Sequence, residues 1–251
     1  MNSLIILPGE CVDASCAELL GVRAAYAFET HGLRPGQRVK AAILGGLRGE
    51  ALVRESSAER VVLELALSLP PRDLRAVDLI VGVSRPQTIK KVVQAAVMLG
   101  ARSLHFVCSE KGEKSYLQST ALLEESLQQE SVKALEQVWD SRPPSISVHR
   151  SFRYFSENKL ESLAGAAGGL KLIAHPSGER VARALTDAKQ ADGRGPASGV
   201  IVAIGPERGW SDAEVATLLQ RGFRVVGLGE RVLRVEIALT FLLGQLEALS
   251  L

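Results

Sequence analysis

Several residue types are scarce in this chain, and each scarcity argues against a class of protein. Only three cysteines occur in 251 residues, and none of them forms a Cys-x-x-Cys pair. An odd number without such a pair argues against a disulfide scaffold or a zinc knuckle, and it favours a reducing cytoplasm. The four histidines never stand four residues apart and flank no acidic metal motif, so the sequence predicts no metal site.

Long apolar runs and an excess of one charge are missing as well. No run approaches about eighteen apolar residues and no charged-then-apolar leader is visible, so neither a membrane span nor a signal peptide is expected. The 30 basic and 28 acidic residues leave a net charge of +2, which excludes a dense basic coat for packaging nucleic acid but not a local basic site. Aromatic residues are only 4% of the chain, which argues against RNA readers that stack bases across a sheet.

Hydrophobic residues make up 46% of the chain, which is enough to form the core of one large domain or two ordinary ones. The first part shows short β-like runs at 38–44 and 61–67. They are separated by Arg34-Pro-Gly-Gln37 and Gly45-Gly-Leu-Arg-Gly49, which are turn signals at hairpin spacing. Pro70-Pro71 then interrupts the chain. The sequence therefore predicts a small β-barrel-like domain over residues 1–71 and a second domain over residues 72–251.

In the second domain, predicted strands alternate with predicted helices. The strands are the apolar runs 79–83, 102–108, 170–174, 200–204 and 223–228, and His175-Pro176 is expected to end the third. The helices are 87–99, 113–139, 179–188, 212–221 behind a capping box at Ser211-Asp-Ala-Glu214, and 235–249, with a loop at 192–199. Repeated strand–helix units without hairpins argue for a parallel α/β sheet.

Three loops that follow predicted strands are candidates for a ligand site, because ligands bind at the carboxyl ends of strands in open parallel sheets. They cover residues 172–176, 204–211 and 227–236. In the second loop, Gly205-Pro206 forces a turn and Ser211 caps the next helix, so backbone N–H groups point outward; an ordinary strand-to-helix turn would share these features. The third loop lacks the third glycine and the Gly-Lys pair of phosphate cradles, so a Rossmann dinucleotide site fits poorly.

Taken together, two of these loops resemble the signature of the RsmE family, bacterial methyltransferases of the SPOUT superfamily that act on uracil N3 of small-subunit ribosomal RNA. The matching stretches are Ile204-Gly-Pro-Glu-Arg-Gly-Trp-Ser211 and Gly227-Leu-Gly-Glu-Arg-Val-Leu-Arg-Val-Glu236. Weaker similarity lies upstream, in His31-Gly-Leu-Arg34, in the predicted helix that ends at Gly100, and in Leu135-Glu-Gln137 with Arg142 and Pro144.

The chain departs from the family pattern at Met98, Asp140, Arg208, Trp210, Val235 and Ile237. Arg208 replaces a usual glycine and Trp210 a usual phenylalanine. Glycine at that position would allow a positive φ or a close ligand, so an arginine there either points away or lies on the substrate side.

The resemblance implies a C-terminal SPOUT-type trefoil-knotted parallel sheet with a small N-terminal PUA-like β-barrel that binds RNA. It also implies S-adenosyl-L-methionine held by backbone groups of the three loops, which agrees with glycine-rich loops that carry no conspicuous charged pocket. The implied cofactor-binding residues are Leu172, Ile173, Ala174, His175, Ile204, Gly205, Pro206, Glu207, Gly209, Leu228, Gly229, Arg231 and Leu233.

The implied reaction is methylation of N3 of a specific uridine in 16S ribosomal RNA, of the uracil-1498 type. Neutral N3 carries a proton, which must leave as N3 attacks the sulfonium methyl group in line. Arg231 and Arg234 are candidates to stabilise the negative charge that develops on the uracil oxygens, and Glu207 is a weaker candidate for the base. On a purely structural interpretation, Glu236 caps its helix and pairs with Arg234.

Basic residues are candidate contacts to RNA phosphates, which position RNA without reading its sequence. They are Arg34, Arg38, Arg85, Lys90, Lys111, Lys114 and Arg208, and solvated surface charge is the alternative for each. The expected partner is 16S ribosomal RNA or the small ribosomal subunit.

The last predicted helix is apolar on nearly every face and therefore needs burial all round. A homodimer, as the resemblance implies, would supply the missing cover.

Three alternatives to an RsmE-like enzyme stay open: a non-catalytic RNA-binding relative, a methyltransferase for a different RNA uridine, and a nucleotide-binding α/β protein of another kind.

Overall fold

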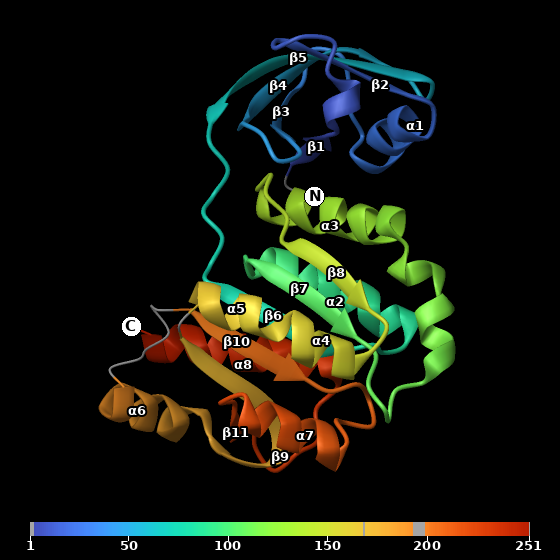
Figure 1. The fold of residues 1–251 in the computed structure, drawn as a ribbon. Coiled ribbons are helices and arrows are strands. Elements are labelled where there is room, and N and C mark those ends of the chain that lie inside the picture. The colour runs from blue at the N-terminus through green and yellow to red at the C-terminus, as the bar shows by residue number, and fades with distance from the viewer. Residues whose placement is uncertain (1–2, 168, 193–198, 251) are drawn as a thin grey trace. The chain divides into compact units, whose positions relative to one another are not determined.

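A computed structural model describes residues 3–167, 169–192 and 199–250, and the chain divides into two compact units (Figure 1). The first unit comprises Met1–Asp73 together with Ser131–Pro143, and the second comprises Leu74–Glu130 and Pro144–Leu251. The first stretch of this unit ends at Asp73, two residues after the proline pair. The return of residues 131–143 to the first unit has no counterpart in the sequence pattern.

A five-stranded mixed sheet with the order β1-β3-β4-β5-β2 forms the first unit. The strands are β1 (Leu4–Ile6), β2 (Cys16–Leu20), β3 (Arg38–Ile43), β4 (Arg48–Ser56) and β5 (Arg60–Leu69), with η1 (Pro8–Glu10) and α1 (Gly21–Thr30) between them. Strands β3, β4 and β5 pair antiparallel, and the turn between β3 and β4 falls at the predicted turn signal 45–49. Strand β4 and its turn to β5 were not predicted. Burial alternates along β5, and Val61, Leu63 and Leu65 join the core as a half-buried strand requires.

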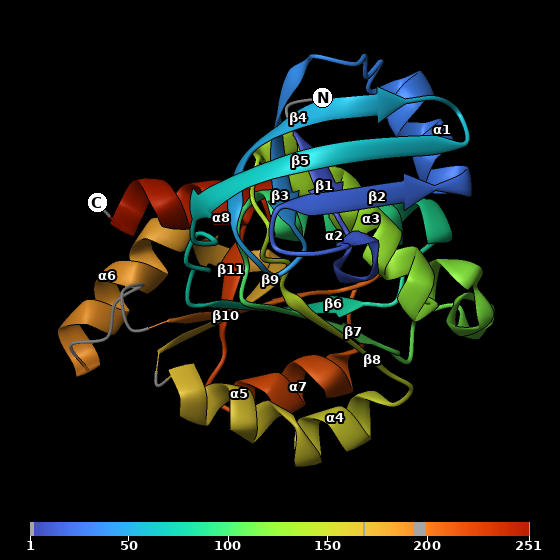
Figure 2. The ribbon, with the colours of Figure 1, turned by 90° about the horizontal axis from the view of Figure 1, so that it is seen from above.

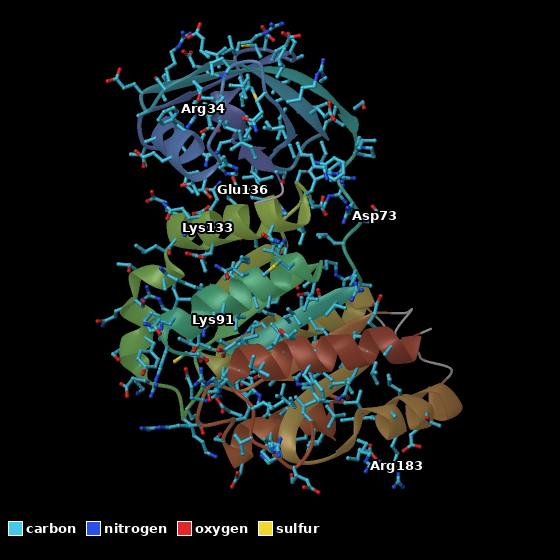
Figure 3. All side chains as sticks on the ribbon, turned by 180° about the vertical axis from the view of Figure 1, so that it is seen from behind. Arg34, Asp73, Lys91, Lys133, Glu136 and Arg183 are labelled. Carbon is cyan, nitrogen blue, oxygen red and sulfur yellow. The ribbon has the colours of Figure 1, made fainter. Side chains whose placement is uncertain are left out.

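A buried carboxylate holds the returning segment in this unit. Glu136 lies on α3 (Glu124–Val138) and its side chain is fully buried (Figure 3). It accepts hydrogen bonds from the Tyr26 hydroxyl at 2.9 Å and from the Ile5 N–H at 3.3 Å, while Ser3 donates to its carbonyl oxygen at 3.0 Å. A buried charge persists only with such partners, so these bonds tie residues 131–143 to the start of the chain.

The second unit contains a six-stranded parallel sheet with the order β11-β9-β10-β6-β7-β8, which confirms the predicted parallel α/β architecture. Its strands are β6 (Val77–Gly82), β7 (Ser103–Val107), β8 (Ser145–His149), β9 (Leu170–Arg180), β10 (Val200–Ile204) and β11 (Arg224–Gly227). All five residues of the central strand β10 are buried, because helices cover both faces of the sheet.

Figure 2 shows α4, α5 and α7 together on one face of this sheet, while α2, α6 and α8 lie on the other. The first group spans Phe152–Asn158, Leu160–Ala167 and Asp212–Gln220, and the second spans Pro86–Met98, Val181–Asp192 and Val235–Ser250. Phe152, Phe155 and Trp210 fill the core on the first side. No helix in the described ranges is long and apolar enough to cross a membrane.

Two predicted boundaries are wrong. Strand β9 does not end at His175-Pro176 but runs to Arg180, because β11 pairs with both of its halves across a shift in register between Val225 and Val226. The long predicted helix 113–139 begins only at Glu124, after two short 3-10 helices, η2 (Lys114–Gln118) and η3 (Thr120–Leu122). Most of the predicted loop 192–199 lies outside the described residues.

Candidate functional site

The carboxyl ends of the parallel strands line a cavity of about 1170 Å³ in the second unit. The middle of β9 contributes residues 174–176, the end of β10 and the loop after it contribute 204–210, and the loop after β11 runs into α8 and contributes 228–236. The segments after β6 and β7 contribute residues 85–88, Lys111 and Tyr116. This volume suits a cofactor together with part of a substrate, since single-ligand sites measure about 300–1,000 Å³. The cavity gathers all the predicted cofactor-binding residues except Leu172 and Ile173, which are fully buried in β9.

Close backbone packing fixes the loop after β10. A Cβ atom at Gly205 would lie 2.8 Å from the Trp210 nitrogen, and one at Gly82 would lie 2.3 Å from the Pro206 side chain. Gly209 has a φ of 72°, and its N–H donates to the Pro206 carbonyl at 2.7 Å. Glycine at these positions therefore lets the loop fold against the end of β6 with its backbone facing the cavity.

The capping box predicted at Ser211 is confirmed and has an additional role. Ser211 and Glu214 exchange hydrogen bonds at the start of α7, as in an isolated capping box. The Glu214 carboxylate also accepts the Ser109 hydroxyl at 2.7 Å and the Glu110 N–H at 2.9 Å. The segment after β7 is thereby tied to the α7 end of the site.

Glu207 caps a neighbouring helix. Its Oε1 accepts the Arg85 N–H at 2.9 Å and the Thr88 hydroxyl at 3.3 Å, at the first turn of α2. The Arg85 side chain cannot cap this helix itself, so Glu207 supplies both the missing acceptor and a negative charge near the positive end of the helix dipole. One oxygen of the predicted base is thus already bound to protein donors.

Basic side chains outnumber acidic ones around the cavity. Its lining contains six basic residues, Arg85, Lys91, Lys111, Arg208, Arg231 and Arg234, and three acidic ones, Glu207, Glu230 and Glu236. Within the described ranges, the side chains of Arg208, Arg231 and Arg234 form no hydrogen bond or ion pair, and all three residues are exposed. Such an excess of free positive charge attracts an anionic ligand.

Glu236 does not pair with Arg234. Its Oε1 instead contacts the Lys91 ammonium group at 3.2 Å, from the first turn of α8 to α2. Figure 3 labels Lys91 on α2. Among the described residues the Arg234 side chain has no partner, and its carbonyl oxygen accepts the Ala238 N–H at 2.8 Å. The structure thereby leaves the Arg234 guanidinium available to a ligand.

The His175 ring packs locally. Its Nδ1 lies 2.8 Å from the Ser177 hydroxyl and accepts the Ser177 N–H at 3.3 Å. These bonds span the segment of β9 where the register of β11 shifts, so His175 shapes the backbone on the cavity wall.

The remaining predicted RNA contacts are scattered. Arg34 and Arg38 belong to the first unit, where Arg34 lies 4.9 Å from the centre of the Phe28 ring and Arg38 pairs with Glu50. Lys90 lies 3.8 Å from the Glu130 carboxylate. Neither Lys90 nor Lys114 is among the described residues that line the cavity.

Sequence reasoning missed Tyr116. This residue lines the cavity from η2, in a segment that the sequence predicts to be helical. Its only signal was its place shortly after a predicted strand, at the edge where ligands bind.

A family model described as an RNA methyltransferase domain matches residues 71–247, so this fold and site are those of an RNA methyltransferase. Ribosomal RNA small subunit methyltransferase E of Treponema pallidum is 32% identical over 208 residues, which cover 82% of this chain and 75% of that protein. The chain belongs to the RsmE family of ribosomal RNA small subunit methyltransferases, as the two signature loops predict.

Two solved structures share the fold over nearly the whole chain. A methyltransferase from Legionella pneumophila, in complex with the cofactor SAM, has a TM-score of 0.77 at 22% identity and covers 99% of this chain and 98% of that one. Ribosomal RNA small subunit methyltransferase E from Neisseria gonorrhoeae, bound to S-adenosyl methionine, has a TM-score of 0.76 at 20% identity and 98% coverage of both chains.

Proposed function

We propose that this chain transfers a methyl group from S-adenosylmethionine to N3 of a uridine in 16S ribosomal RNA, of the uracil-1498 type. The observation that carries the proposal is the cavity at the carboxyl ends of the sheet, which joins glycine-rich loops to an excess of basic side chains. The names of the relatives support ribosomal RNA as the substrate class. The proposal includes a cytoplasmic location, which the cysteine usage leads us to expect and which suits a ribosomal RNA substrate.

The middle of β9 and the loops after β10 and β11 fit the cofactor. A Cβ atom added at Gly209 or Gly229 would meet nothing within 4 Å, so the backbone at both positions borders open space. Backbone N–H and C=O groups there can recognise a nucleoside and an amino-acid group without charged side chains. When bound, S-adenosylmethionine supplies a methyl group on a positively charged sulfur, which a nucleophile displaces.

The chain's own residues would position the uracil and stabilise its charge. Arg231 and Arg234 line the cavity and have no side-chain partner in the part of the chain that the structure describes. A guanidinium beside the uracil oxygens lowers the pKa of the N3–H group. Glu207 would serve mainly to hold the loop against α2, as its two hydrogen bonds indicate. Orientation and arginine charge together are then the main contributions to rate.

The finer features of the family belong to the same proposal. They are a closed PUA-like barrel in the first unit, a trefoil knot in the second and a homodimer. Support for the homodimer comes from Ile237 and Phe241, which lie one turn apart on α8, are 50% and 47% exposed and line the same hollow. Large apolar side chains grouped on one surface favour a second copy of the chain as their cover.

Calorimetric titration with S-adenosylmethionine tests the proposal, followed by methyl transfer from labelled cofactor to unmodified small ribosomal subunits. We expect saturable binding at one site per chain and label at one uridine, located by a stop in primer extension. Gly205→Val should weaken cofactor binding about tenfold or more, because the added side chain collides with the Trp210 backbone. The control Gly9→Val, in open space in the first unit, should bind normally.

Folded protein that binds small-subunit RNA but gives no heat with the cofactor would refute the proposal. It would favour a non-catalytic RNA-binding protein. Label at another uridine would support methyltransferase activity but show that the target nucleotide is a different one.

A further inference from the structure

Tyr116 is an aromatic side chain on the cavity wall. It is half-buried, and in the part of the chain that the structure describes its hydroxyl makes no hydrogen bond and its ring packs against no other ring. Partly buried tyrosines usually satisfy the hydroxyl group and pack the ring. A ring left open on a cavity wall is suited to contact with a ligand.

The position of Tyr116 separates it from the proposed cofactor loops. It follows β7, whereas the proposed cofactor residues lie on β9 and in the loops after β10 and β11. In the order β11-β9-β10-β6-β7, three strand spacings, or about 14 Å, separate β9 from β7. The cavity therefore spans more strands than a cofactor held at β9 and β10 would cover, and Tyr116 lines a part of it that can hold the substrate.

The backbone of Tyr116 is held in place. The Glu214 carboxylate anchors Ser109 and Glu110 before it, as described above. Within η2 the Tyr116 N–H donates to the Glu113 carbonyl at 3.0 Å, and the Tyr116 carbonyl accepts the Ser119 N–H at 3.1 Å. A ring on a fixed backbone loses little conformational entropy when it binds.

Free cations lie around the same cavity. Lys111 and Arg208 both line it and are exposed, and Arg208 forms no ion pair within the described ranges. An aromatic ring combined with basic side chains is the usual arrangement for an unstacked nucleotide, whose base stacks on the ring while its phosphates contact the cations.

We propose that Tyr116 stacks on the uracil ring of the target nucleotide, extruded from the RNA, while Lys111 and Arg208 bind the neighbouring phosphates. This inference rests on the proposed function and adds the residue that holds the base. Enzymes that modify a base commonly take it out of its stack in this way, and the open ring provides the surface that receives it.

Photocrosslinking tests the contact without relying on activity. The probe is a small ribosomal subunit reconstituted with RNA in which 5-iodouridine replaces uridine, since near-ultraviolet light joins this base to a stacked aromatic ring with loss of iodide. We expect mass spectrometry to find uridine attached to the peptide that carries Tyr116. Crosslinks confined to other peptides would overturn the proposal.

Kinetics supply the second readout. Tyr116→Ala should lower kcat/KM for RNA about 5- to 150-fold, the usual loss for one base-stacking ring, and Tyr116→Phe should retain most of the activity. The matched control is Tyr154→Ala, because Tyr154 is 55% exposed on α4, and it should behave as wild type. Unchanged kinetics of Tyr116→Ala would refute stacking.

Cofactor titration distinguishes this inference from the proposed function. Both Tyr116 variants should bind S-adenosylmethionine as wild type does, which also shows that they fold. If the wild-type chain neither binds the cofactor nor transfers methyl, the proposed function fails, and the crosslinked peptide alone decides whether Tyr116 holds an RNA base.

Discussion

Replacing Glu207 separates two roles for a carboxylate on the cavity wall. As a cap, its Oε1 accepts the Arg85 N–H and the Thr88 hydroxyl at the start of α2. As a general base, the same group would have to take the N3 proton of uracil. Glu207→Gln keeps an acceptor oxygen and removes the charge, whereas Glu207→Ala removes both.

The structure sets different magnitudes for the two variants. Loss of a side-chain cap costs about 0.5–2 kcal/mol, and the charge of an exposed residue near a helix dipole contributes about 0.3–1 kcal/mol. Glu207 is exposed, so the charge contribution lies at the low end. A change of 1 kcal/mol shifts Tm by about 2–4 °C in a protein of this size, so Tm should fall by about 2–8 °C in Glu207→Ala and less in Glu207→Gln.

The assay is methyl transfer to small ribosomal subunits across a range of pH, with thermal melting of each variant. If Glu207 is a cap, Glu207→Gln stays within about tenfold of wild type and keeps the wild-type pH profile, because removing a general base costs about 10²–10⁴. Glu230→Gln, an exposed carboxylate on the same wall, is the matched control. A loss above about 100-fold in Glu207→Gln with an altered pH profile and unchanged Tm would refute the capping argument.

Three further changes have defined outcomes. Gly82→Ala should abolish most cofactor binding in calorimetry, because its Cβ would lie 2.3 Å from the proline in the loop after β10; normal binding would contradict this packing. Glu136→Ala should lower the free energy of unfolding by about 3 kcal/mol in urea titrations, since the Tyr26 hydroxyl loses its buried acceptor; a loss below about 1 kcal/mol would count against this. Burial and the neighbouring His149 lower the pKa of His105 to about 4. Because the unfolded chain takes up this proton at a higher pH than the folded chain does, the free energy of unfolding has its full value above about pH 6.5 and declines toward pH 4. His105→Gln should flatten this acid decline in pH-dependent unfolding, and an unchanged slope would assign it to other groups.

The features that the sequence predicts well depend on neighbouring residues. Turn residues placed the hairpin of β3 and β4, and a short apolar run flanked by glycines placed β10. The capping box at Ser211 needs only four consecutive residues, so it too was predictable. The cavity followed from the rule that ligands bind where parallel strands end.

The features that the sequence misses depend on distant partners. Proline in His175-Pro176 suggests that the strand stops there, yet pairing with β11 continues beyond it. The ion pair of Glu236 goes to Lys91, more than a hundred residues away, and no local spacing indicates that choice. The place of Tyr116 on the cavity wall also depends on distant residues, because it follows from the packing of the segment after β7 against α7.

The division of the first unit has a consequence for synthesis on the ribosome. Residues 1–73 emerge first, but the carboxylate that accepts the Ile5 N–H and the Tyr26 hydroxyl arrives only with Glu136. Until then two polar groups of the nascent unit lack their partner, so this unit completes folding only after a large part of the second has been translated. A fragment cut at the Pro70-Pro71 junction would carry the same defect permanently.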